Sequence, residues 1–103
     1  MAGMHSHTKE QREAVRQLVY TVVTRDMSTF TPDAFRHWIK DTDQKFRKVA
    51  LTLKFEIRER VVYFMVKEVR SGRVIHRFDS STRVPFDDRD VIMTLDDAKP
   101  LWR

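Results

Sequence analysis

Basic side chains gather in the middle of this 103-residue chain, in a stretch with the pattern of β-strands. Residues 51–78 carry seven Lys and Arg against three Asp and Glu, within a net charge of +5 for the whole chain. A basic surface with an aromatic ring can hold single-stranded nucleic acid or the acidic surface of a protein. The candidate binding residues are Lys54, Arg58, Arg60, Tyr63, Lys67, Arg70, Arg73 and Arg77.

The histidines and aspartates offer little further chemistry. His5 and His7 could chelate a metal weakly, but no second pair stands at ligand spacing. Asp87, Asp88 and Asp90 lack the glycine and the distal glutamate of a calcium loop, and we interpret them as solvated acids. We therefore expect no metal site and no cofactor.

Catalytic motifs are missing from the sequence. The chain has no cysteine, which excludes thiol nucleophiles, disulfides and thiolate zinc sites. Gly3 and Gly72 are its two glycines, too few for a phosphate-binding loop, and no serine stands in a nucleophile elbow. We predict that the protein is not an enzyme.

Two stretches have the spacing of amphipathic helices, and both begin with a capping sequence. Thr8 and Gln11 have the form of a capping box, and the apolar stripe that follows predicts a helix from about Lys9 to Arg25. Thr31 is a capping residue before Pro32, which begins a second helix that ends near residue 48.

The period changes to two after residue 50, which indicates strands. We predict strands over residues 51–57, 61–69 and 74–78, with turns at 58–60 and 70–73. His76 alternates with Val74 and Phe78, so we expect a half-buried histidine on the core side. Pro85 excludes a central strand or the middle of a helix at its position, and residues 91–95 are predicted to form a fourth strand.

These elements predict one α+β domain over residues 1–103. Two N-terminal helices are expected to pack on a three- or four-stranded antiparallel β-meander, with flexible ends at residues 1–7 and 98–103. The expected core is Val15, Leu18, Val19, Val22, Phe35, Ile39, Phe46, Leu51, Leu53, Phe55, Val62, Phe64, Val66 and Ile75.

Hydropathy and cysteine usage predict where the protein resides. No apolar run approaches the ~20 residues that a membrane span needs, and the first residues lack the pattern of a signal peptide. The lack of cysteine fits a reducing compartment. We expect a cytoplasmic protein with no membrane partner.

Three stretches of the predicted sheet carry a family resemblance: residues 53–60, 63–69 and 72–78. They resemble the core of the FlaG family of flagellar proteins, which has an "LxF" strand, a "vVKV" strand and a "tGeVIRqIP" return, over about a quarter of the chain. Asp79 stands where the family has proline, Pro85 interrupts the expected C-terminal amphipathic helix, and the first helix has no counterpart. The resemblance implies a small non-enzymatic bacterial protein tied to flagellar filament assembly.

Three functions follow from these observations. The first is a protein-interaction or assembly module that binds a protein partner, or itself, through the sheet edge or the helix pair. The alternative is a nucleic-acid-binding module that uses the basic face of the sheet. A small enzyme or a regulatory inhibitor is the third, and no motif supports it.

Overall fold

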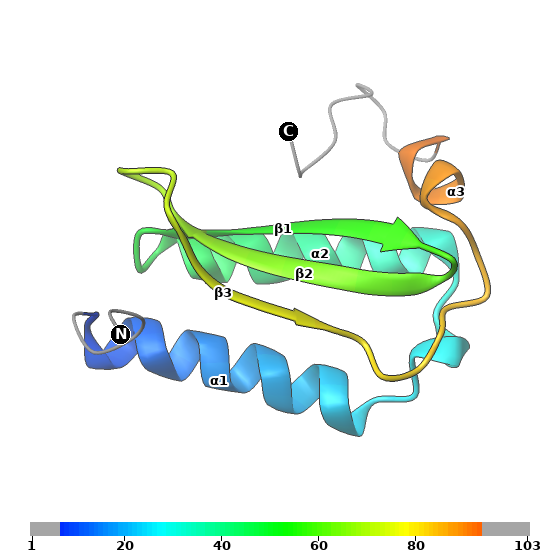
Figure 1. Cartoon of the computed structure of the whole chain (residues 1–103), viewed down its shortest axis with the longest axis horizontal. Coiled ribbons are helices and arrows are strands. Elements are labelled where there is room, and N and C mark those ends of the chain that lie inside the picture. The colour runs from blue at the N-terminus through cyan, green and yellow to red at the C-terminus, as the bar shows by residue number, and fades with distance from the viewer. Residues whose placement is uncertain (1–6, 94–103) are drawn as a thin grey trace.

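The computed structural model describes residues 7–93 of the chain, and side chains as far as Val91. Its elements are α1 (Lys9–Thr24), the short 3-10 helix η2 (Met27–Thr29), α2 (Pro32–Arg47), β1 (Leu51–Arg58), β2 (Val61–Glu68), β3 (Val74–Asp79) and α3 (Asp88–Met93), as Figure 1 shows. Two N-terminal helices therefore precede a three-stranded antiparallel sheet, and the predicted α+β class is confirmed.

The sheet is a meander with the strand order β1-β2-β3. Leu51 pairs with Glu68 at one end of the first hairpin, and Arg58 pairs with Val61 at the turn. The β2–β3 pairing contains an irregularity between Val66 and Lys67. In Figure 1, α2 lies behind the sheet and α1 runs beside β3. The strand order makes β1 and β3 the two edge strands of the sheet.

The two long helices begin at the predicted capping residues. The Thr8 hydroxyl accepts a hydrogen bond from the Gln11 amide at 3.0 Å, and the Gln11 side chain accepts one from the Thr8 amide at 3.1 Å. Thr31 accepts from the Ala34 amide at 3.1 Å, and Pro32 is the first residue of α2. Capping satisfies amides that have no partner within a helix, so the starts are well defined in the sequence.

Both hairpin turns contain residues with positive φ, but the residue types differ. In the β1–β2 turn, Glu59 and Arg60 have φ values of 52° and 67°. Positive φ at both central residues of a two-residue loop defines a type I′ turn, whose twist matches that of the strands. In the β2–β3 turn, Gly72 has a φ of 74°, as its sequence position predicted.

The region after β3 corrects one prediction. Val91 to Met93 belong to α3 rather than to a fourth strand, and residues 94 and 95 lie outside the described residues. The Asp90 carboxylate accepts a hydrogen bond from the Asp87 amide at 2.9 Å, which favours a helical turn here. A short apolar run has no periodicity that separates strand from helix, which explains the wrong prediction.

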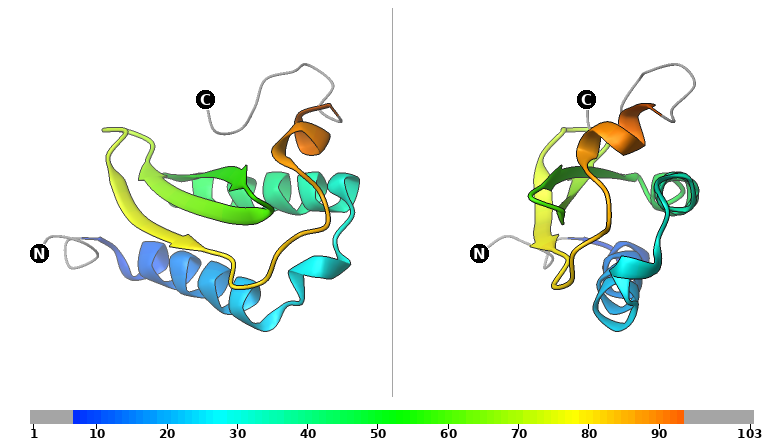
Figure 2. Two further views of the ribbon diagram at one scale, coloured as in Figure 1. Left: turned by 45° about the vertical axis from the view of Figure 1, so that its right-hand side comes forward. Right: turned by 90° about the vertical axis from the view of Figure 1, so that its right-hand side faces the viewer.

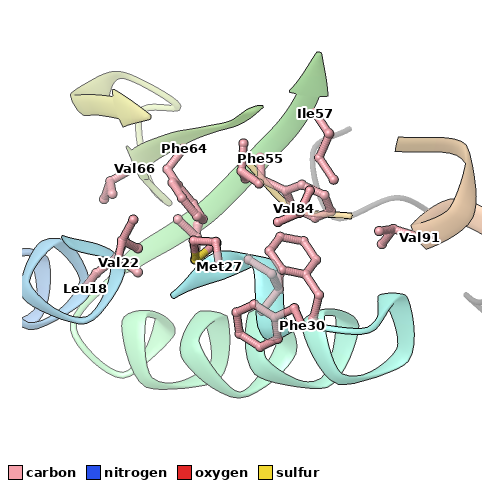
Figure 3. Packing of buried hydrophobic residues seen from close by; sticks show 14 of the residues in the cluster. Leu18, Val22, Met27, Phe30, Phe55, Ile57, Phe64, Val66, Val84 and Val91 are labelled. Atoms are coloured by element: carbon pink, nitrogen blue, oxygen red, sulfur yellow. The ribbon is translucent and has the colours of Figure 1, made fainter. Parts of the chain in front are cut away.

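The core lies between the sheet and the helices, as Figure 3 shows. Twelve of the fourteen expected residues are buried, whereas Val19 and Ile75 are partly buried against the core. Six buried residues were not expected, and most of them lie in the connections and in α3: Met27, Phe30, Ile57, Val84, Phe86 and Val91. The loops therefore complete the core that the regular elements begin.

An aspartate from each of two helices closes the free edge of β1. Asp43 of α2 is 6% exposed, and its Oδ1 accepts hydrogen bonds from the Leu53 amide at 2.8 Å and the Thr52 hydroxyl at 2.9 Å. Asp88 of α3 accepts from the main-chain amide of Ile57. These carboxylates occupy two of the amides that an additional strand would need.

Candidate binding surface on the outer face of the sheet

The helices cover one face of the sheet and leave the other exposed. In the right-hand view of Figure 2, α1 and α2 lie on the same side of the strands. Side chains alternate along a strand, so every second residue points away from these helices. The outer face carries Lys54, Glu56, Arg58, Tyr63, Met65, Lys67, Arg77 and Asp79.

These outer side chains line a shallow groove of about 570 Å³. Lys54 pairs with Met65, and Met65 pairs with Arg77, so a methionine lies between two cations in one row across the sheet. In the next row, Tyr63 lies between Glu56 and Asp79. The groove therefore has a half-buried Tyr and Met at its centre and charges of both signs around them.

Arg58 and Tyr63 form a preorganised pair within the groove. The guanidinium carbon of Arg58 lies 4.2 Å from the centre of the Tyr63 ring, which is a cation–π contact. The same guanidinium has its Nε 3.8 Å from a carboxylate oxygen of Glu56. One face of the aromatic ring is thus covered by a cation, and the guanidinium keeps other N–H groups for a ligand.

Burial lowers the pKa of Lys54, because partial removal from water disfavours the charged ammonium. The carboxylate of Asp43 opposes this effect, whereas the cations Arg47 and Lys67 add to it. The charged form of Lys54 is therefore less favourable in the folded chain than it would be in water.

The structure divides the eight predicted binding residues into two sets. Lys54, Arg58, Tyr63, Lys67 and Arg77 lie together on the outer face. Arg60, Arg70 and Arg73 lie outside this groove, in the turns that flank β2.

The three turn arginines have other surroundings. Arg60 lies 3.6 Å from Asp87, and Arg73 lies 3.6 Å from Glu68, both through ion pairs at the surface. Arg70 is an exposed residue of the β2–β3 turn. They were predicted to bind only because they are basic. In the structure, the hairpin register places them in turns outside the groove.

Glu56, Met65 and Asp79 belong to the groove and were not predicted. A signal for them exists in the sequence. The two-residue turn at Glu59 and Arg60 fixes the β1–β2 pairing. Even-numbered residues of β1 and odd-numbered residues of β2 therefore point to the same face of the sheet. A search restricted to basic and aromatic residues missed them.

His76 lies on the helix-facing side of β3, opposite Val66, and is half-buried, as predicted. Its ring centre lies 5.6 Å from that of Phe78. Over residues 7–93, no group of three or more His, Cys, Asp or Glu is arranged to hold a metal ion. Within the same residues, no helix has both the length and the apolar character needed to cross a membrane.

Comparison with known proteins gives no relative for this arrangement. The chain matches no family model, no curated protein and no solved structure.

Proposed function

We propose that the chain is a non-enzymatic protein-binding module whose binding surface is the outer face of the sheet. The observation that carries this proposal is the composition of that face. Tyr63 and Met65 lie at its centre, and charged side chains of both signs surround them. Protein interfaces have this anatomy, with an aromatic and methionine-rich centre and a polar rim.

The stacked Arg58 and Tyr63 strengthen the case for a protein partner. Arginine and tyrosine are the residue types most often responsible for binding energy at protein interfaces. Because the two side chains already contact each other at 4.2 Å, their ordering cost on binding is reduced. A partner surface with both acidic and apolar groups would complement the groove.

A nucleic acid is the second candidate ligand, supported by the four cations Lys54, Arg58, Lys67 and Arg77 on one face. Glu56 and Asp79 lie among them, and a carboxylate repels phosphate. Fluorescence anisotropy with labelled single-stranded RNA and duplex DNA tests this candidate. Affinity that persists near physiological salt would favour nucleic acid, whereas we expect binding to disappear as salt is added.

The FlaG-like pattern of the hairpin supports a component of the flagellar filament as the partner. The pattern includes Lys54, Tyr63, Met65, Lys67 and Arg77, which are residues of the outer face. The proposal of a protein-binding face does not depend on this choice of partner.

The test uses one substitution inside the groove and one matched substitution outside it. Met65→Asp places a carboxylate at the centre of the groove, and Val69→Asp makes a similar change at an exposed apolar residue just beyond β2. Immobilised wild-type and variant chains are compared for the proteins that they retain from a lysate of the source cells. The proteins are quantified by mass spectrometry and then titrated individually by calorimetry.

We expect a partner that wild type and Val69→Asp retain equally, and that Met65→Asp binds at least about tenfold more weakly, as for a central interface residue. Equal binding by all three chains would move the interface elsewhere. The lack of any partner dependent on this face would contradict the proposal.

A further inference from the structure

The outward main-chain groups of β3 form an open sheet edge. The Ser80 amide donates to the Val62 carbonyl at 2.8 Å, so the even-numbered residues at this end of β3 direct their N–H and C=O toward β2. By the alternation of an antiparallel ladder, Arg77 and Asp79 direct theirs away from the sheet. Within residues 7–93, these outward groups have no hydrogen-bond partner. β3 can therefore accept another strand.

An apolar strip of α1 lies beside this open edge. Tyr20 is 66% exposed and Val23 is 64% exposed, and both are large hydrophobic residues. They line a shallow groove of about 520 Å³ together with Val15, Val19, Arg12 and Arg16 of the same helix and His76 of β3. Figure 1 shows α1 running along β3. A strand added to β3 would thus cover apolar surface as well as form main-chain hydrogen bonds.

The charges of β3 are complementary to themselves under a two-fold rotation. In an antiparallel pair of β3 strands related by an axis at Phe78, Arg77 of each copy lies opposite Asp79 of the other. Both residues direct main-chain groups outward, so each such pair is a hydrogen-bonded pair of the ladder. An axis at Arg77 would instead place two arginines opposite each other, which is unfavourable.

We propose that the chain forms a two-fold dimer in which β3 pairs with β3 of a second copy. The two meanders become one continuous sheet, with the Arg77–Asp79 ion pairs on its outer face. The Phe78 residues meet on the helix side, where Tyr20 and Val23 of each copy are covered by the other. This dimer uses Arg77 and Asp79 at the margin of the outer-face groove and leaves its central residues Tyr63 and Met65 free for the protein-binding function proposed above.

Charge reversal tests both the dimer and its register. Arg77→Asp places carboxylates opposite Asp79, and Asp79→Arg places guanidinium groups opposite Arg77. We expect sedimentation equilibrium to give the wild type about twice the 12.4 kDa mass of one chain. Each single variant should associate at least about tenfold more weakly, because two attractive cross-strand pairs become repulsive.

Two further mixtures make the test specific for this register. The double variant Arg77→Asp/Asp79→Arg restores both ion pairs with their signs exchanged, so we expect it to dimerise again. An equal mixture of the two single variants should form a heterodimer, because every Asp then faces an Arg. A merely destabilised fold would not recover in either way, and circular dichroism verifies that each variant is folded.

Arg70→Asp is the matched control, since it makes the same change of charge at an exposed turn residue away from the β3 edge. We expect its dimerisation to equal that of wild type. A wild-type chain that stays monomeric at every concentration would overturn the proposal. A dimer that is indifferent to both single reversals, or that the double variant fails to restore, would overturn it as well. None of these results would change the partner binding expected for Met65→Asp, so the outer-face function is tested separately.

Discussion

The two edge strands of the sheet differ in what lies beside them. At the β1 edge, Asp43 accepts from the Leu53 amide at 2.8 Å, and Asp88 accepts from the Ile57 amide. At the β3 edge, the outward groups of Arg77 and Asp79 have no partner among the described residues. One sheet thus has an edge closed by side chains of two helices and an edge left open.

This difference shows that edge protection is local rather than a property of the whole sheet. Closing β1 requires a carboxylate that is almost fully buried, and Asp43 is acceptable there because the Nε of Arg47 also lies 2.9 Å from its Oδ2. Within residues 7–93, no helix carboxylate accepts a hydrogen bond from an outward amide of β3. Natural sheets usually blunt edges that could pair with another chain, so the open edge of β3 is the place where the dimer proposed above would form.

The largest expected effect compares a phenylalanine of each edge strand. Phe55 of β1 is 2% exposed and packs edge-to-face on Phe35 at 5.2 Å, so Phe55→Ala should lower the free energy of unfolding by about 3–5 kcal/mol. Phe78 of β3 is half-buried and stacks on Phe64 at 5.0 Å, and Phe78→Ala should cost only about 1–2 kcal/mol. Urea unfolding measures both. A loss under about 1 kcal/mol for Phe55→Ala would mean that β1 does not face the core.

The next prediction opens the closed edge. Asp43→Ala leaves the buried Leu53 amide and Thr52 hydroxyl without their acceptor, and should cost about 2–3 kcal/mol. Amide hydrogen exchange at Leu53 should also accelerate, since its hydrogen bond is lost. Asp41→Ala is the control, because Asp41 is an exposed residue of the same helix. Similar stability losses in the two variants would show that Asp43 does not close the edge.

The smallest expected effect concerns the second carboxylate at the β1 edge. Burial, and then the nearby Glu56 carboxylate, raise the pKa of Asp88, against the hydrogen bond from Ile57. A raised carboxyl pKa means that ionisation costs more in the folded chain than in the unfolded one. The protonated carboxyl of Asp88 therefore stabilises the fold relative to the ionised one. This stabilisation is fully present below the usual pKa of 3.8 and is lost as the pH rises through the raised pKa.

Asp88→Asn removes the charge and keeps an oxygen acceptor for the Ile57 amide. We expect the variant to match wild type in acid and to be slightly more stable than wild type near neutral pH. Thermal melts over a series of pH values measure the difference, with Asp87→Asn as a control at an exposed neighbour. A variant that is less stable than wild type at neutral pH would show that the negative charge itself holds the edge closed.

Much of the fold could be predicted because its signals are local. Capping at Thr8 and Thr31 and the period-two alternation of β1 depend on neighbouring residues only. The burial of Met27 and Val84 could not be predicted in this way, because loop residues enter a core only through tertiary packing. The type I′ turn was also missed, since Glu59 and Arg60 adopt a backbone that usually requires Asn or Gly.

The candidate site could be predicted in part, for a related reason. Charge composition identified the basic strands and Tyr63, which lie in the groove. It did not reveal that Arg60 and Arg73 pair with acids elsewhere, because an ion pair between distant residues depends on the register and the turns. The open edge of β3 depends on where the helices pack, so no property of residues 74–79 alone distinguishes it from the closed edge of β1.

The closed edge of β1 sets the valency of the molecule. A chain that could pair at both edges would act as a bifunctional monomer and grow into a fibre of unlimited length. With Asp43 and Asp88 at the β1 edge, β3 is the edge that residues 7–93 leave open, and the dimer proposed above would end its growth after one pairing step. In the language of polymerisation, the proposed pairing makes this chain monofunctional: two copies join at β3, and the β1 edges of the dimer add no third copy.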